Sequence, residues 1–225
     1  ETMVAGGPAP SGDRLAQHPQ MPLVVAAAAL RDGDFAAYRD HLNGHFAAQG
    51  LMPPIPEGAT EFSFGALAGA TVSEDGADRS GPLVSVVMTT YNSAATLDYA
   101  VASLRAQTHG NLEILIVDDG STDGTREMLA TAAAADPRIR VLLNDENVGT
   151  YCSKNRAIAE AKGAYVTLHD SDDWAHPERI ARHVALMEKS KSLMASRSEW
   201  LRIEADGTPA FRRWGRRFQH PNPAS

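Results

Sequence analysis

The sequence LVSVVMTTYN, residues 83–92, decides the fold of this chain. Its first six residues are mostly apolar and rich in valine, which predicts a buried β-strand. The last four carry hydroxyl, phenol and amide groups, so the strand is expected to end in a polar loop. Residues 94–106 then place Leu97, Val101 and Leu104 on one face of a predicted helix.

Strand and helix patterns alternate outward from this stretch across residues 82–190. Further elements are expected as strands at 112–117, 139–143 and 164–169 and as helices at 122–135, 150–162 and 177–189. Continuous apolar strands joined by helices indicate a parallel sheet with helices on both faces. The sequence therefore predicts an α/β fold.

A helical accessory segment and a linker are expected before the sheet, over residues 21–81. Two helices are predicted at 22–31 and 34–49, and Asp34 is placed to cap the second. The second helix carries an apolar stripe that needs a partner, made of Phe35, Tyr38, Leu42 and Phe46. Residues 73–82 have the composition of a linker.

The two ends of the chain differ from its sheet-forming part. Residues 1–20 are rich in Gly, Pro and Ala, which predicts disorder. Near the other end, 193–204 and 209–214 are predicted strands joined by a hairpin turn at Asp206-Gly207. No element closes the fold after them, so residues 82–225 are expected to form one domain that is incomplete at its C-terminus.

The composition is that of a folded protein with an acidic body. The chain is 43% hydrophobic and 22% charged, with a net charge of −7. This charge disfavours general nucleic-acid binding, which is driven by phosphate neutralisation. No apolar run approaches the ~20 residues of a membrane span, and the single cysteine cannot form a disulfide within the chain. We therefore expect a cytoplasmic protein, with a place at the inner face of the membrane left open.

Carboxylates follow two of the predicted strands. Asp118 and Asp119 come after the second strand, and the sequence DSDD follows the fourth at 170–173. The carboxyl ends of parallel strands meet at one edge of a sheet, which is where ligands bind in open α/β folds. Carboxylates gathered there repel one another unless a cation joins them. Mg²⁺ or Mn²⁺ suits such oxygen ligands and is commonly held by one or two carboxylates plus substrate phosphates.

Simpler roles compete for several of these residues. Ser121, Thr122 and Asp123 are predicted to form a turn and cap the next helix. Residues 170–173 could instead form a solvated loop. Tyr91 could instead be an ordinary aromatic residue of the core or its rim.

Other ligand motifs fail on spacing. A calcium loop starting at Asp119 would need Glu at its twelfth position, where Ala130 stands. No Gly-x-Gly-x-x-Gly follows a strand, and no phosphate-binding loop with Gly-Lys-Ser/Thr is present. Cys152 with scattered histidines gives no zinc spacing.

Four motifs together resemble the family 2 glycosyltransferases of the GT-A fold. They are VSVVMTTYN at 84–92, IVDDGSTDGT at 116–125, NVG at 147–149 with Lys154-Asn155, and HDSDDW at 169–174. Their order and separations fit the family over residues 82–190. The resemblance implies a Rossmann-like GT-A sheet. It also implies transfer of a sugar from a nucleotide-sugar donor to a saccharide or other hydroxyl acceptor. The implied reaction depends on a metal and inverts the sugar, and UDP is the favoured nucleotide.

The resemblance implies roles for residues at the ends of the first two strands. Thr89 and Tyr91 would contact the nucleotide base, with Tyr91 stacking on it. Asp119 would accept a hydrogen bond from the base imide, with Asp118 beside it near the ribose.

The acidic motif would hold the metal and the diphosphate. Asp172 would bind the divalent metal, and Asp170 would support the ribose or the metal. The metal is needed because negative charge grows on the leaving diphosphate as the glycosidic bond breaks. Lys154 has two open roles, helping the phosphates or closing a helix face.

The general base of the family is a carboxylate well downstream of the acidic motif. The remaining acidic residues, Glu199, Glu204 and Asp206, lie in or near the predicted hairpin, so the base is expected beyond Ser225. A second hypothesis is therefore a non-catalytic module that binds a nucleotide-sugar or acts as a scaffold. The basic run at 212–217 is interpreted as a solvated strand face, with an anionic ligand as the alternative.

A third hypothesis, a nucleotidyltransferase, is disfavoured. Such an enzyme would be expected to show a Gly-rich basic loop where residues 89–93 read TTYNS. The favoured setting, by resemblance alone, is assembly of surface or capsular polysaccharide in a bacterium.

Overall fold

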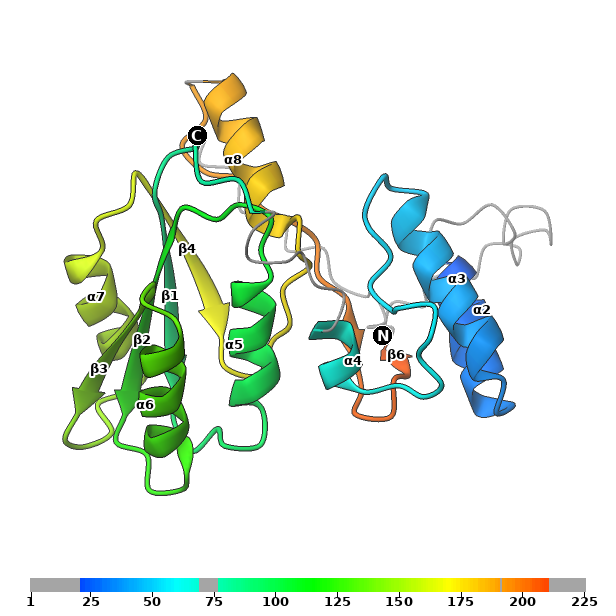
Figure 1. Cartoon of the computed structure of the whole chain (residues 1–225), viewed down its shortest axis with the longest axis horizontal. Helices are drawn as coiled ribbons and strands as arrows, with labels where there is room; N and C mark the ends of the chain where they lie inside the picture. Colours follow the sequence, from blue (N-terminus) through cyan, green and yellow to red (C-terminus); the bar gives the residue numbers. More distant parts are fainter. Residues whose placement is uncertain (1–20, 69–76, 191, 211–225) are drawn as a thin grey trace, which may run out of the picture.

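Four parallel strands form the central sheet of this computed structural model, which describes residues 21–68, 77–190 and 192–210 (Figure 1). The strands are β1 (Val84–Thr90), β2 (Leu112–Asp119), β3 (Ile139–Asn144) and β4 (Tyr165–Asp170), in the order β3-β2-β1-β4. All three pairings are parallel. The predicted α/β fold with a Rossmann-like sheet is confirmed.

Helices cover the sheet on both faces, but unequally. One face is packed by α5 (Leu97–Arg105), α6 (Thr125–Ala135) and α8 (Arg179–Lys189), whose apolar residues share a core with β1 and β2. The other face is packed by α7 (Thr150–Glu160), where Ala157 contacts Val87 and Leu115. On β4, Val166 and Leu168 belong to this second face and are 46% and 48% exposed. The expected cover therefore holds over β1 and β2 and is incomplete at β4.

Helices also precede the sheet in the described part of the chain. We call residues 21–68 the helical unit; it contains α2 (Met21–Arg31), α3 (Phe35–Ala47) and the short α4 (Phe64–Ala68). Asp34 caps α3 by accepting a hydrogen bond from the Ala37 amide at 3.0 Å. The predicted stripe packs into a core of its own, where Tyr38 and Leu42 are fully buried. The five-residue α4 was not predicted, since it is too short to show a helical period.

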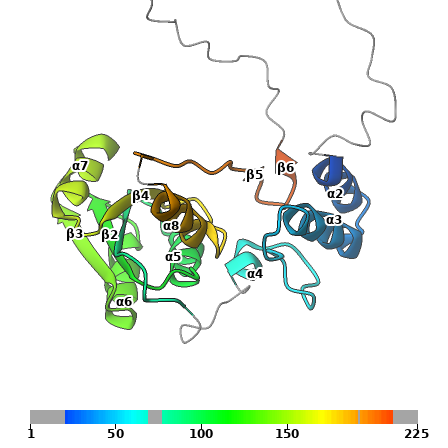
Figure 2. The same ribbon diagram turned by 90° about the horizontal axis from the view of Figure 1, so that it is seen from above.

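The hairpin near residue 207 packs against the helical unit. Its strands, β5 (Arg202–Ile203) and β6 (Pro209–Ala210), are antiparallel. β5 is much shorter than the strand predicted at 193–204, and β6 reaches the last of the described residues. The Tyr38 hydroxyl donates to the Gly207 carbonyl at 2.7 Å. A Cβ at Gly207 would lie 2.6 Å from Phe62, so the close approach requires glycine. Figure 2 shows this hairpin beside α2 and α3, away from the four-stranded sheet.

Some sequence-based expectations fall outside the described residues. They are the disorder of 1–20, the part of the linker at 73–76, and the basic run at 212–217. Within the described part of the chain, no helix has both the length and the apolar character needed to cross a membrane.

Candidate functional site

The carboxyl ends of all four strands bring polar side chains to the face of the sheet that α7 covers. Thr89 is the register partner of Asp170, and Asp119 is the partner of Asn144. Side chains alternate along a strand, so Thr89 shares the face of Val87, and Asp119 shares the face of Val117. The sheet therefore gathers hydroxyl, carboxylate and amide groups from four separate strands at one edge.

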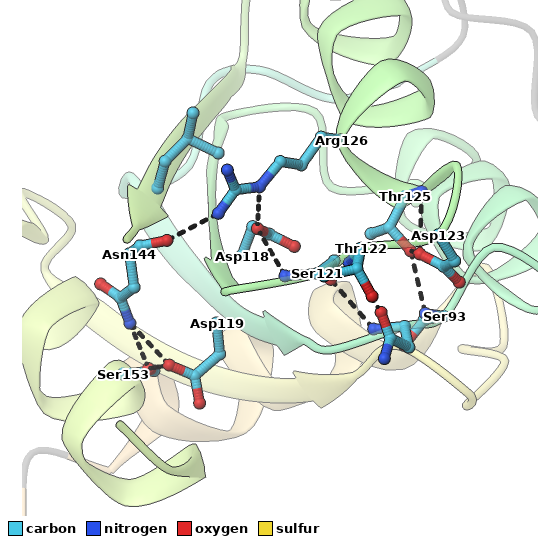
Figure 3. Close-up of polar contacts among 12 residues, drawn as sticks. Ser93, Asp118, Asp119, Ser121, Thr122, Asp123, Thr125, Arg126, Asn144 and Ser153 are labelled. Carbon is cyan, nitrogen blue, oxygen red and sulfur yellow. Dashed lines mark hydrogen bonds and ion pairs between the residues drawn. The ribbon is translucent and has the colours of Figure 1, made fainter. Parts of the chain in front are cut away.

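Asp119 is the centre of a hydrogen-bond network behind this edge (Figure 3). Its Oδ1 accepts from Asn144 Nδ2 at 2.7 Å, Ser153 Oγ at 2.9 Å and the Val148 amide at 3.0 Å, and its Oδ2 accepts from the Gly149 amide at 2.9 Å. Burial raises the pKa of Asp119, but these hydrogen bonds outweigh burial and hold the pKa below its usual value. An ionised carboxylate thus fixes the loop between β3 and α7.

Asp118 points to the opposite face of the sheet. Its Oδ2 accepts from Arg126 Nε at 2.7 Å and from the Ser121 amide at 3.2 Å, and Arg126 also donates to the Asn144 carbonyl. Figure 3 shows the two neighbouring carboxylates diverging, Asp118 toward Arg126 and Asp119 toward Ser153. Asp118 is fully buried, and its Oδ1 has no hydrogen-bond partner among the described residues. Its contact with a ribose stays a prediction.

Side chains tie the loops after β1 and β2 together. The Asn92 amide donates to Ser121 Oγ at 2.9 Å, and the Thr122 amide donates to Asn92 Oδ1 at 2.9 Å. Asn92 has a φ of +48°, a left-handed conformation that asparagine tolerates better than most residues. Asp123 makes the expected turn by accepting from the Thr125 amide, but it also accepts from the Ala94 amide in the other loop. The sequence predicted only the local part of this arrangement.

The loop after β4, residues 170–173, joins the same assembly and is called the acidic loop here. The hydroxyls of Ser171 and Ser93 share a hydrogen bond at 2.9 Å. Lys154, from α7, donates to Asp170 Oδ1 at 2.7 Å. The structure therefore brings Lys154 to the acidic loop and places it in an ion pair with one of the predicted site residues.

Asp172, a second carboxylate of the acidic loop, faces solvent. Asp172 is exposed, and no described residue donates a hydrogen bond to its carboxylate. The pKa of Asp173 is raised by partial burial and then by the charges of Asp172 and Asp170. This crowding of like charges is what a bound cation would relieve.

The acidic loop fits one kind of metal site and not another. Across the described ranges, no group of three or more His, Cys, Asp or Glu side chains is placed to hold a metal ion. A cage made of protein ligands alone is thus not formed. One or two carboxylates that share Mg²⁺ or Mn²⁺ with phosphate oxygens need no such group, and Asp172 with Asp170 matches that requirement.

Tyr91 follows β1 with its side chain 50% exposed. Because the ring is exposed beside the strand ends, it is compatible with the predicted stacking on a nucleotide base. The downstream acids lie elsewhere: Glu204 pairs with Arg202 in the hairpin, and Asp206 accepts from the Thr208 amide.

Three residues of the site were given no role by the sequence analysis. Asn144 and Ser153 complete the Asp119 network, and a signal for Asn144 existed, because it directly follows a predicted strand. Tyr99 donates from its hydroxyl to the Asp172 carbonyl at 3.1 Å. That contact joins residues 73 apart in the chain, so no local pattern indicates it.

Comparisons with known proteins agree on one family. The chain is 37% identical over 128 residues to the putative teichuronic acid biosynthesis glycosyltransferase TuaG of Bacillus subtilis (strain 168), covering 57% of this chain and 50% of that protein. It is 37% identical over 113 residues to the putative glycosyltransferase EpsE of the same organism, covering 50% and 41%. The chain thus spans half or less of the length of these curated relatives.

Solved structures give a weaker likeness. The S. aureus TarS 1–349 structure in complex with UDP-GlcNAc is 28% identical, with a TM-score of 0.45, over 47% of this chain and 31% of that one. The family model described as Glycosyl transferase family 2 matches residues 85–215, more than half of the chain. This match includes all four strands and the acidic loop, and the chain belongs to glycosyl transferase family 2.

Proposed function

We propose that this chain binds a UDP-sugar at the carboxyl edge of its sheet and transfers the sugar, with inversion, to a hydroxyl acceptor in surface polysaccharide synthesis. The observation that carries the proposal is the convergence of Thr89, Asp119, Lys154 and Asp170 on one face, beside an exposed Asp172, in a member of this family. The TarS 1–349 structure described above holds UDP-GlcNAc, which is a donor of the proposed class.

The proposed base pocket lies between Tyr91 and Asp119. The exposed Tyr91 ring offers an apolar face for stacking, and Thr89 lies one residue inside the end of β1. Among the described residues, Asp119 Oδ2 accepts a hydrogen bond from Gly149 alone, so this oxygen has capacity for the imide N–H of a uracil. Because the network keeps Asp119 ionised, the residue acts only as an acceptor there.

The proposed diphosphate region lies at the acidic loop. Asp172, with Asp170, would hold Mn²⁺ or Mg²⁺, which neutralises charge on the departing diphosphate. Lys154 holds Asp170 by its ion pair and brings a positive charge to the same edge. A donor phosphate near this ammonium group would compete with Asp170 for it.

A non-catalytic donor-binding module remains the second candidate, and one observation favours it. Within the described residues 192–210, the carboxylates Glu204 and Asp206 belong to a hairpin that packs on the helical unit. Neither contacts the strand ends, and the general base predicted beyond Ser225 stays a prediction.

Calorimetric titration of the whole chain with UDP, with and without Mn²⁺, tests the proposal. We expect Mn²⁺ to tighten UDP binding, and Asp172→Ala to weaken the Mn²⁺-dependent binding at least tenfold, or about 1.4 kcal/mol. Glu127→Ala is the matched control, since Glu127 is an exposed acid on α6. Absence of Mn²⁺-dependent binding to UDP, GDP and dTDP by the folded chain would overturn the proposal.

Release of UDP from UDP-sugars separates the two candidates. A transferase is expected to release UDP by transfer or by slow hydrolysis, and Asp172→Ala is expected to abolish this. Tight, metal-dependent donor binding with no turnover would support the binding module instead.

A further inference from the structure

The acidic loop continues into a segment held by the helical unit. Trp174, directly after the loop, packs into the core formed by the helical unit. The His176 ring stacks on Phe46 of α3, with ring centroids 5.5 Å apart and planes 9° apart. His176 Nε2 also hydrogen-bonds the Met52 carbonyl at 2.9 Å. Residues 174–176 are thus fixed by contacts outside the sheet.

A second route from the helical unit reaches the acidic loop itself. The ring of Tyr99, on α5, stacks on Phe64 of α4 with centroids 4.9 Å apart and planes 24° apart. Phe64 in turn contacts Phe62 edge-on at 5.2 Å, and Phe62 contacts Tyr38 of α3 at 6.1 Å. The helical unit therefore supplies a continuous set of ring contacts that ends on Tyr99.

Tyr99 links these rings to the peptide of Asp172. Its hydroxyl donates to the Asp172 carbonyl at 3.1 Å. A tyrosine hydroxyl is protonated at neutral pH, so it can act as the donor in this bond. The Asp173 amide donates to the Asp170 carbonyl at 3.1 Å, so the loop is a tight turn, and fixing one peptide constrains its neighbours.

Exposed carboxylates are useful for metal binding only if their backbone is held in place. A flexible loop must be ordered when the ligand binds, and that ordering costs conformational entropy. The Asp172 side chain has no partner among the described residues to hold it. Its position is set by its own peptide, and Tyr99 is the side chain that bonds that peptide.

We propose that Tyr99 is a positioning residue for the acidic loop and that the helical unit, through Phe64, sets how well this loop binds metal with the donor diphosphate. This inference rests on the proposed function for its ligand and on the observed contacts for its mechanism. It assigns the helical unit a part in donor binding, although none of its side chains is placed at the strand ends.

Tyr99→Phe tests the link, because it removes the hydroxyl and keeps the ring stack. The readout is the ratio of the UDP dissociation constants without and with Mn²⁺. We expect this ratio to fall about fivefold, the effect of one net hydrogen bond, while binding without Mn²⁺ stays as in the wild type. Tyr151→Phe, an exposed tyrosine on α7, is the matched control and should leave the ratio unchanged. Equal weakening with and without Mn²⁺, or an unchanged ratio in Tyr99→Phe, would overturn the inference.

Phe64→Leu tests whether the helical unit acts through Tyr99. This substitution removes the ring that stacks on Tyr99. We expect the ratio of the UDP dissociation constants without and with Mn²⁺ to fall, as in Tyr99→Phe. The double variant should be no worse than Tyr99→Phe alone, because both changes break one connection. Fully additive losses would contradict action through Tyr99.

Amide hydrogen exchange of the ligand-free chain tests the mechanism without any donor. Tyr99→Phe should speed exchange in peptides that cover 170–176 and leave β1 to β3 at their wild-type rates. If the wild type binds no nucleotide, the proposed function fails, whereas unchanged exchange in Tyr99→Phe overturns the positioning role by itself.

Discussion

At the scale of single residues, Asp118 and Asp119 show how neighbours in sequence take different roles. They follow one another at the end of β2, so the alternation of a strand sends their side chains to opposite faces. Asp118 meets Arg126 on the α6 side, while Asp119 meets amides and hydroxyls on the α7 side. Asp118 supports the turn after β2, and Asp119 supports the loop between β3 and α7.

Asp119→Asn should destabilise the fold. The Asn amide cannot accept the four hydrogen bonds that the carboxylate accepts, and a donor would face the amides of Val148 and Gly149. We expect a loss of about 2–4 kcal/mol in the free energy of unfolding, measured by urea denaturation. Asp145→Asn, an exposed acid of the same loop, is the control. A loss below 1 kcal/mol would show that the network is dispensable.

Lys154→Met decides between the two roles left open for this lysine. Its ion pair joins a side chain 16% exposed to one 54% exposed, so we expect a stability change within about 1 kcal/mol. UDP binding should weaken severalfold if the ammonium also meets the phosphates. Lys162→Met, an exposed lysine just after α7, should leave binding unaltered. Binding equal to wild type would assign Lys154 to the helix face.

The partly buried His176 is expected to make the folded chain less stable in mild acid. Burial lowers its pKa, and Arg182 adds to this, whereas the Met52 carbonyl and Glu178 act in the opposite direction. The pKa of His176 is below 6.5 in the folded chain, so the unfolded chain binds the proton first as the pH falls. The contribution of His176 to the free energy of unfolding is therefore present above pH 6.5 and is lost as the pH falls below it. The same direction holds for His183.

Urea denaturation at pH 7.5 and pH 5.0 measures this effect. We expect His176→Gln to lose less stability between these pH values than the wild type loses. His41→Gln, an exposed histidine of α3, should behave as the wild type. An unchanged pH dependence in His176→Gln would contradict the assignment.

At the scale of elements, the loops after the strands are built against one another. The turn after β2 is the clearest case, because Gly120 has a φ of +82° and lies against the loop after β3. A Cβ there would lie 2.8 Å from the Asn147 nitrogen and 2.8 Å from the Glu146 carbonyl carbon. Both contacts are with backbone, so relief would require the loop itself to move.

Gly120→Ala should therefore cost at least about 2 kcal/mol of stability and weaken UDP binding. Gly124→Ala is the matched control four residues on, with a φ of −68° and open space around its Cβ position. We expect that variant to be neutral or slightly more stable. Thermal unfolding of both variants checks the pair, and equal melting temperatures would refute the close packing of these loops.

At the scale of the whole molecule, two cores meet at the segment after the acidic loop. One core lies between the sheet and α5, α6 and α8, and the other lies within the helical unit. Trp174 belongs to the second core, although it follows a strand of the sheet. Damage to the helical unit is therefore expected to reach the acidic loop before it reaches the strands.

Leu42→Ala tests this spread. Leu42 is fully buried in the second core, so its truncation should cost about 2–5 kcal/mol. Amide hydrogen exchange should rise in α2, α3 and residues 172–178 and stay low in β1 and β2. Val24→Ala, on the exposed side of α2, is the control. Exchange that rises only within α2 and α3 would show that the two cores are independent.

Local sequence patterns were sufficient to predict the helices and strands and their order. Valine-rich runs and apolar stripes predicted every strand of the sheet and six of its flanking or preceding helices to within a few residues, because these signals depend on neighbours along the chain. Asp34 as a cap and the hairpin at residue 207 were predicted on the same local basis. The four-motif pattern also indicated the family to which the chain belongs.

The contacts between distant side chains could not be predicted from local patterns. One face of β2 packs against α6 and the other against α7, which places Asp118 and Asp119 in different surroundings. Packing, rather than the motif, sets which residue lies on which face. The Lys154–Asp170 pair and the Tyr99–Asp172 hydrogen bond join positions 16 and 73 apart. Such contacts depend on strand register and on how distant helices pack, which a local pattern does not encode.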